Sequence, residues 1–100
     1  MKFEDLEKMV IEWAEDRGIF EQANTAAQFV KLGEEYEELH MALTFNNKKE
    51  IIDSIGDMLV VMTILTHMFE VDLFKCYATA YLEIKDRKGK MVDGLFVKEK

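Results

Sequence analysis

The residues whose types and spacing could do chemistry are carboxylates, and the first group lies in a Glu-Glu-Tyr-Glu-Glu segment. Each residue of a helix turns the chain by about 100°, so Glu34, Glu35 and Glu38 would fall within an arc of about 100°. Leu39 lies next to Glu35 on the same helix. These carboxylates therefore border an apolar stripe, where charged groups need a partner.

A second acidic group follows on the next predicted helix. Glu50, Asp53 and Asp57 would fall within an arc of about 60° that also flanks an apolar side. Glu-rich segments alone are typical of solvated helix faces, but Asp is a poor helix former, so this second group favours a function. Two antiparallel helices would bring the two groups together.

A cluster of like charges predicts a bound cation, because carboxylates so placed repel and raise one another's pKa values. Mg²⁺ suits the set best, with Mn²⁺ as a possible substitute, since hard ions prefer oxygen ligands and pair with phosphates. Neither acidic face carries a histidine, which disfavours zinc: His40 is predicted to be a surface residue, and His67 a packed or interface residue. A di-iron site gets little weight, because Glu37 and His40 alone have the Glu-x-x-His spacing and lie off the main acidic arc.

Four helices are predicted to position these carboxylates. The chain has no proline, and its apolar residues recur at helical spacing. Gly18 is expected to end the first helix in a left-handed cap, and Asp72 to cap the last. Short connections such as Asn46-Asn47 favour antiparallel neighbours, hence an all-α antiparallel bundle. The predicted helices span about 3–17, 21–45, 48–69 and 72–84, the second with an apolar stripe of Phe29, Leu32, Tyr36, Leu39 and Leu43.

The last part of the chain departs from the helical pattern. Asp93-Gly94 is a turn dipeptide with apolar residues on both sides, which predicts a short C-terminal hairpin or arm over 91–97. Charge changes there as well: residues 1–82 carry a net charge of −9 and residues 83–100 a net charge of +2. An acidic body with a basic tail suggests a divalent cation in one place and phosphate in another.

Length and charge limit the remaining possibilities. A chain of 100 residues fits a single domain, 1–100, and a net charge of −7 argues against general nucleic-acid binding. The apolar run Met58–Phe69 is shorter than the about twenty residues that a membrane span needs, so no membrane association is expected. Because that run is apolar nearly all round, a partner chain is predicted to cover it. The lone Cys76 and the acidic N-terminus favour the cytoplasm.

Three segments of this chain resemble the MazG-like all-α nucleotide pyrophosphohydrolases. Residues 31–39, Lys-Leu-Gly-Glu-Glu-Tyr-Glu-Glu-Leu, resemble the family's E-E-x-x-E segment. Residues 53–59, Asp-Ser-Ile-Gly-Asp-Met-Leu, resemble its second segment, E-x-x-D. With the tail at 85–90, the likeness runs from about Trp13 to about Lys98. The compact length resembles short, stand-alone members of the kind that phage genomes carry.

One departure from the family pattern concerns the metal ligands. Ser54 stands where the pattern has Glu three residues before Asp57, and a hydroxyl binds magnesium less well than a carboxylate. Asp53 is one residue out of register but lies on the same helix face as Asp57. Alternatively, Glu50 and Asp53 supply the E-x-x-D pair and Asp57 is an additional ligand. The order of preference is Asp57, Asp53, Glu50.

The resemblance implies hydrolysis of nucleoside triphosphates to monophosphate and pyrophosphate, in a homodimer or homotetramer. Glu35, Glu38, Asp53 and Asp57 would hold Mg²⁺, and Glu34 would position or deprotonate the attacking water. The implied substrate contacts are basic residues for the phosphates and residues of the first helices for the base or sugar: Lys31, Lys85, Arg87 and Lys88 for the former, and Trp13, Arg17 and Gln28 for the latter.

Two further readings stay open. A dUTPase or a phosphoribosyl-ATP pyrophosphohydrolase would share the scaffold and use related carboxylates. From a different class, the chain would be a catalytically inert helical bundle that acts as an interaction module, with Ser54 recording the loss of metal binding. The sequence does not choose the base.

Overall fold

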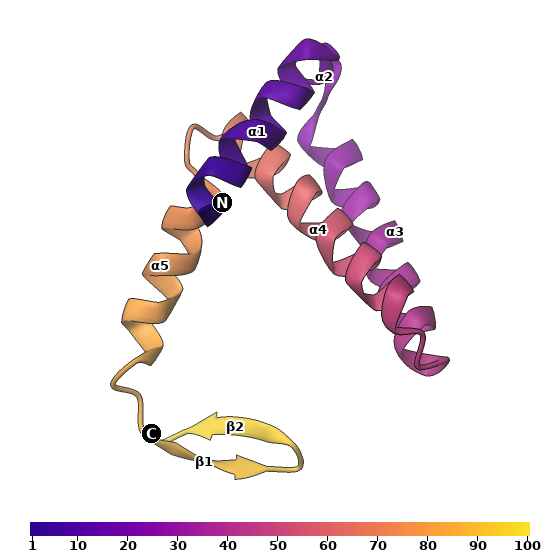
Figure 1. Ribbon diagram of the computed structural model, residues 1–100. Helices are drawn as coiled ribbons and strands as arrows, with labels where there is room; N and C mark the ends of the chain where they lie inside the picture. Colours follow the sequence, from indigo (N-terminus) through magenta and orange to yellow (C-terminus); the bar gives the residue numbers. More distant parts are fainter.

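The computed structural model describes residues 1–100 and contains five helices followed by a two-stranded hairpin (Figure 1). The predicted helical architecture with a C-terminal hairpin is confirmed. In chain order the elements are α1 (Phe3–Asp16), α2 (Ile19–Gln22), α3 (Thr25–Thr44), α4 (Lys48–Met68), α5 (Leu73–Ile84), β1 (Gly89–Val92) and β2 (Leu95–Lys98).

Helix ends follow the capping residues. Gly18 is left-handed, with φ of 69°, as predicted for the end of the first helix. The predicted single helix over 21–45 is wrong at its start, because the side chain of Asn24 accepts a hydrogen bond from the Ala27 backbone (2.8 Å) and begins a new helix. The short α2 precedes that cap, so the chain has five helices where four were predicted. Asp72 caps α5 as predicted, accepting from the Lys75 backbone at 2.6 Å.

Helices α3 and α4 form an antiparallel pair that carries much of the interior. Their connection is tight, with Asn46 at a positive φ of 52° and the Asn47 side chain capping α4. The buried residues of the pair include Glu35 and Ala42 on α3 and Ser54 and Val61 on α4. Most of these side chains are small or polar, which lets the two helices approach closely and puts a carboxylate in their interface.

The direction of α5 is fixed by Glu7 of α1. This carboxylate is buried and accepts hydrogen bonds from the backbone N–H groups of Leu73 and Phe74, at the start of α5. The first N–H groups of a helix have no partner within the helix, so Glu7 satisfies two of them and places a negative charge at the positive helix end. The sequence pattern alone did not indicate this contact.

The C-terminal hairpin has the predicted turn. Asp93 and Gly94 both have positive φ (50° and 82°), as a two-residue hairpin turn requires. Gly89 pairs with Lys98 across the strands, and any Cβ at position 89 would collide with the Val97 carbonyl. Every residue of both strands is exposed. The hairpin is therefore well formed but uncovered.

The chain as a whole is open. In Figure 1 the α3–α4 pair forms one limb, α5 and the hairpin form another, and α1 lies where the limbs meet. The radius of gyration is 16.0 Å, against about 13 Å for a compact domain of this length. Only 8 of 100 residues are buried, and the stripe of Phe29, Tyr36 and Leu43 is 70%, 60% and 57% exposed. A closed bundle does not form within one chain, because no element of the chain covers that stripe.

Helix α4 is longer than the apolar run on which the expectation of no membrane association was based. Taken as a whole, its 21 residues are long and apolar enough to cross a bilayer by length and composition. The shorter run considered in the sequence is only the second half of this helix. A single such helix is weak support for a membrane span, because core helices have the same composition. Only 22% of this apolar stretch of α4 is buried within the chain.

Candidate functional site

Three of the predicted carboxylates meet between α3 and α4. One oxygen each from Glu35, Glu38 and Asp57 lies within 4.8 Å of the others. Glu35 is only 4% exposed, and its Oε2 atom is buried without any hydrogen-bond partner. A buried carboxylate oxygen without a donor is costly, so this arrangement fits a cation that all three groups could bind.

The electrostatics of these carboxylates show their mutual repulsion. A hydrogen bond that protonated Glu38 can donate to Glu35, together with the negative charge of Glu35, raises the pKa of Glu38. Partial removal from water, and then the charges of Glu35 and Asp53, raise the pKa of Asp57. Both shifts favour the protonated form. A divalent cation would reverse them, because it stabilises the ionised carboxylates.

Lys31 supplies the positive charge nearest to the cluster. Its Nζ lies 3.2 Å from Glu35 and 3.6 Å from Glu34, and this pairing raises the pKa of Lys31, chiefly through the hydrogen bond to Glu35. Glu34 itself is exposed, and Lys31 lies between it and the buried Glu35. Lys31 thus lies beside the cluster, and its role as a phosphate contact stays a prediction.

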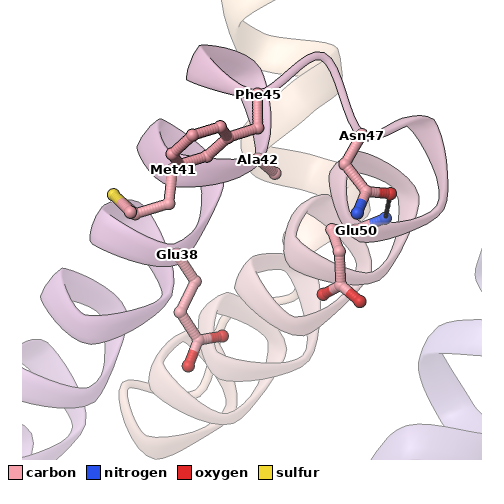
Figure 2. Close-up of a pocket in the computed structure, with 6 residues that line it drawn as sticks. All are labelled: Glu38, Met41, Ala42, Phe45, Asn47 and Glu50. Atoms are coloured by element: carbon pink, nitrogen blue, oxygen red, sulfur yellow. Dashed lines mark hydrogen bonds between the residues drawn. The ribbon is translucent and has the colours of Figure 1, made fainter.

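The other candidate ligands lie on α4 around this centre. Asp53 is close enough to Asp57 to raise its pKa. Glu50 lies in the first turn of α4, and Figure 2 shows it across from Glu38, with which it lines a hollow of about 260 Å³ at the closed end of the α3–α4 pair. Ser54 is 3% exposed, so the position where the family pattern has Glu is occupied here by a small buried side chain.

Residues of α1 reach the same centre from another side. Trp13 and Met9 line a mainly apolar hollow of about 320 Å³ together with Asp57 of α4. The Arg17 guanidinium lies 4.7 Å from the centre of the Trp13 ring, and its Nη1 donates to the Trp13 carbonyl. Gln28 is half-buried on α3, one turn before Lys31. The structure thus brings an aromatic, apolar surface to the edge of the carboxylate cluster.

The predicted basic contacts of the tail do not reach this centre within one chain. Lys85, Arg87 and Lys88 follow α5, on the limb away from α3 and α4 (Figure 1). Arg87 and Lys88 line a separate polar hollow with Lys98 and Lys100, which the sequence patterns did not single out. Met9 was likewise not predicted, because its place beside Asp57 depends on how α1 packs on α4.

Comparison with known families decides the relationship. A model of the phosphoribosyl-ATP pyrophosphohydrolase family matches residues 3–81, most of the chain and all of the carboxylate cluster. The chain belongs to this family. The match confirms the resemblance to MazG-like all-α pyrophosphohydrolases.

This pyrophosphohydrolase family member is also similar to a phage protein. The chain is 42% identical over 69 residues to an uncharacterized 18.2 kDa protein in the rep-hol intergenic region of Haemophilus phage HP1 (strain HP1c1). The match covers 69% of this chain and 42% of the phage protein. The chain thus spans less than half the length of that relative. No solved structure matches the chain significantly.

The melting temperature of this pyrophosphohydrolase-family chain should rise when Mg²⁺ is added. In the absence of metal it should fall as pH rises. Because the pKa values of Glu38 and Asp57 are raised on folding, the metal-free folded state binds more protons between their unfolded and folded values. The stability contributed by the pair is therefore expected to fall as pH rises through that window. Added Mg²⁺ should raise Tm at pH 7.5, by an amount equivalent to about 2.7 kcal/mol at a hundred times Kd, and raise it less at pH 5.

Glu38→Gln separates these effects by differential scanning calorimetry. In chelator the variant should melt above the wild type at pH 7.5, because one repelling charge is gone. When Mg²⁺ is added, the variant should not show the rise in Tm that the wild type shows. The matched change Glu37→Gln, on the same helix and outside the cluster, should keep the rise. A variant that melts lower in chelator would contradict the repulsion described above.

Proposed function

We propose that the protein hydrolyses nucleoside triphosphates to nucleoside monophosphate and pyrophosphate with the help of Mg²⁺. The observation that carries this proposal is the convergence of Glu35, Glu38 and Asp57 within 4.8 Å, in a chain of a pyrophosphohydrolase family. The assignment of Mg²⁺ follows from the donor set, which consists of carboxylate oxygens without histidine or cysteine.

Glu35, Glu38 and Asp57 would hold the ion, with Asp53, whose charge acts on Asp57, as the first candidate for a fourth carboxylate. A bound Mg²⁺ would neutralise phosphate charge and lower the pKa of a coordinated water. Glu50 is a weaker candidate, because it lies toward the closed end of the α3–α4 pair. Mn²⁺ would substitute, since it accepts the same oxygen ligands.

The remaining polar residues of the centre divide the work on the substrate. Glu34 is exposed beside the cluster and would position or deprotonate the attacking water. The substrate's phosphates would draw Lys31 away from Glu35, which leaves both Glu35 oxygens free for the cation. Lys31 thus serves as a counter-ion before binding and as a phosphate contact afterwards.

The base or sugar would lie in the hollow formed by Met9, Trp13 and Asp57. Its mainly apolar walls suit the faces of a nucleobase, and the indole of Trp13 offers a stacking surface about 42% exposed. Arg17 stacks on that ring and would orient it, and Gln28 would contribute a hydrogen bond. This hollow adjoins Asp57, so a nucleotide held there would present its phosphates to the carboxylates.

The functional unit would be a homodimer or homotetramer. A compact monomer of 11.7 kDa exposes about 5,900 Å², whereas this chain exposes 8221 Å². The excess of about 2,300 Å² per chain, or about 4,600 Å² for two chains, lies in the range of total area that obligate dimers bury. The stripe of Phe29, Tyr36 and Leu43 points away from Glu38 on α3, so a partner could cover it and leave the carboxylates open. Asp53 and Asp57 favour a protein partner over a bilayer along α4.

Two other functions have specific support. The matching family is named after phosphoribosyl-ATP pyrophosphohydrolase, which favours phosphoribosyl-ATP as the second candidate substrate. The buried Ser54, in place of a family carboxylate, favours an inert interaction module as the candidate from another class. The module would not bind the metal, whereas either enzyme would.

A substrate panel tests these alternatives together. Pyrophosphate release is measured for canonical and modified ribo- and deoxyribonucleoside triphosphates, dUTP and phosphoribosyl-ATP, with Mg²⁺ and with chelator. We expect release from at least one triphosphate, at a rate that chelator abolishes. Release from phosphoribosyl-ATP alone would select the second candidate. No release from any nucleotide, together with no Mg²⁺ binding by calorimetry at pH 7.5, would select the inert module.

A further inference from the structure

The basic tail is the one group of predicted site residues that a single chain leaves away from the carboxylates. Lys85, Arg87 and Lys88 begin an arm that continues through the hairpin, here defined as residues 85–98. The arm follows α5, whose first backbone N–H groups are bound by Glu7. It is separated from the α3–α4 pair (Figure 1). Within one chain, these basic residues therefore lie away from the carboxylates, where the substrate's phosphates would bind.

The arm lacks the support that an isolated hairpin needs. Two-stranded hairpins are marginally stable on their own in water. All eight strand residues are exposed, among them Met91, Leu95 and Phe96 at 65%, 71% and 52%. The apolar side chains of the arm thus need a surface that this chain does not provide.

Charge and area favour a second copy of the chain as that surface. Residues 83–100 carry a net charge of +2 and residues 1–82 a net charge of −9, so the arm of one copy complements the body of another. The excess exposed area per chain is enough for an obligate interface. At the base of the arm, Arg87, Lys88, Lys98 and Lys100 line a hollow of about 480 Å³ that also holds three carboxylates.

We propose that the arm of one protomer lies against the carboxylate cluster of a second copy, where Lys85, Arg87 and Lys88 contact the substrate's phosphates. The inference rests on the proposed pyrophosphohydrolase function and adds to it that each site is made by two chains. Arg87 would bind phosphate oxygens in a bidentate manner, and the lysines would act as point charges. Lys31 provides the cation from the same chain as the carboxylates.

Mixed oligomers of two defective full-length variants test this arrangement. One variant carries Glu38→Gln, and the other carries Lys85→Ala, Arg87→Ala and Lys88→Ala. All four side chains are exposed, so both proteins should fold. Each variant alone should lose most activity. The two coexpressed in equal amounts should recover about one quarter of wild-type activity, because a quarter of the sites pair intact carboxylates with an intact arm.

Binding provides a readout that does not depend on turnover. Calorimetry with a non-hydrolysable α,β-methylene triphosphate and Mg²⁺ should count about one quarter of wild-type sites in the mixture. Sedimentation should show oligomers for the wild type, both variants and the mixture. A control with Lys8→Ala and Lys75→Ala removes exposed positive charge elsewhere and should keep full activity and binding.

The outcomes separate this inference from the proposed function. If the wild type is active but the mixture recovers neither activity nor binding, the basic residues act within their own chain and the inference is wrong. Full activity of the arm variant, or a monomeric wild type, would overturn it as well. If the wild type hydrolyses no nucleotide, the proposed function fails first and the shared site fails with it.

Discussion

Glu38→Gln and Asp57→Asn are each expected to slow pyrophosphate release by about 100-fold or more. Loss of a residue that merely supports a metal ligand already costs about 10- to 100-fold in activity, and loss of the ligand itself should cost at least as much. Both substitutions remove a charged oxygen from the cluster and leave side-chain size nearly unchanged. Both side chains are exposed, so the fold should persist. Rates should be measured at saturating Mg²⁺ with the best triphosphate of the panel, beside circular dichroism spectra.

Glu37→Gln is the matched control, because Glu37 lies on α3 next to Glu38 but outside the cluster. It should keep activity within about twofold, as surface substitutions generally do. Asp53→Asn and Glu50→Gln then rank the fourth ligand: Asp53→Asn should weaken Mg²⁺ binding more. Wild-type rates for both Glu38→Gln and Asp57→Asn would place the chemistry elsewhere in the molecule.

Leu43→Lys is expected to turn the oligomer into monomers. In one chain Leu43 is 57% exposed and follows Phe29 and Tyr36 along the uncovered stripe of α3, so an isolated monomer would tolerate lysine. In an interface the same change would bury an unpaired charge, at a cost of about 3 kcal/mol or more, which is over a hundredfold in Kd. Analytical ultracentrifugation across a range of concentrations measures the change.

Thr44→Lys is the control for this change. Thr44 is exposed and follows Leu43 directly, but it points about 100° away from the stripe. This variant should sediment like the wild type. If both lysine variants sediment like the wild type, the stripe of Phe29, Tyr36 and Leu43 is not the interface. If the wild type is itself monomeric, the excess exposed surface of the chain must have another partner.

Local signals in the sequence were sufficient for most elements. Gly18, Asp72 and the Asp93-Gly94 turn were predicted correctly, because each depends on one residue's backbone preference or cap. The break at Asn24 was missed, although Asn is a strong cap, because the apolar pattern continues on both sides of it. Glu7 could not be predicted, since its role requires α1 and α5 to meet across 66 residues of sequence.

The carboxylate cluster was predictable for a different reason. Glu35 and Glu38 are three residues apart on one helix, and a short turn makes the next helix antiparallel, so geometry brings Asp57 opposite them. The hollow beside Trp13 follows from the packing of α1 on α4, which periodicity does not specify. Burial was overestimated for Phe29, Tyr36 and Leu43, because helical periodicity shows which face is apolar but not which chain covers it.

The most direct test of the proposed reaction is to identify its products. A panel of triphosphates labelled at the α- and γ-phosphates is incubated with the wild-type protein and Mg²⁺, and the products are separated by ion-exchange chromatography. We expect nucleoside monophosphate and pyrophosphate in equal amounts, because the cluster adjoins the hollow proposed for the base and would act at the phosphorus nearest to the sugar. Nucleoside diphosphate with inorganic phosphate, or no product from any member of the panel, would contradict the account.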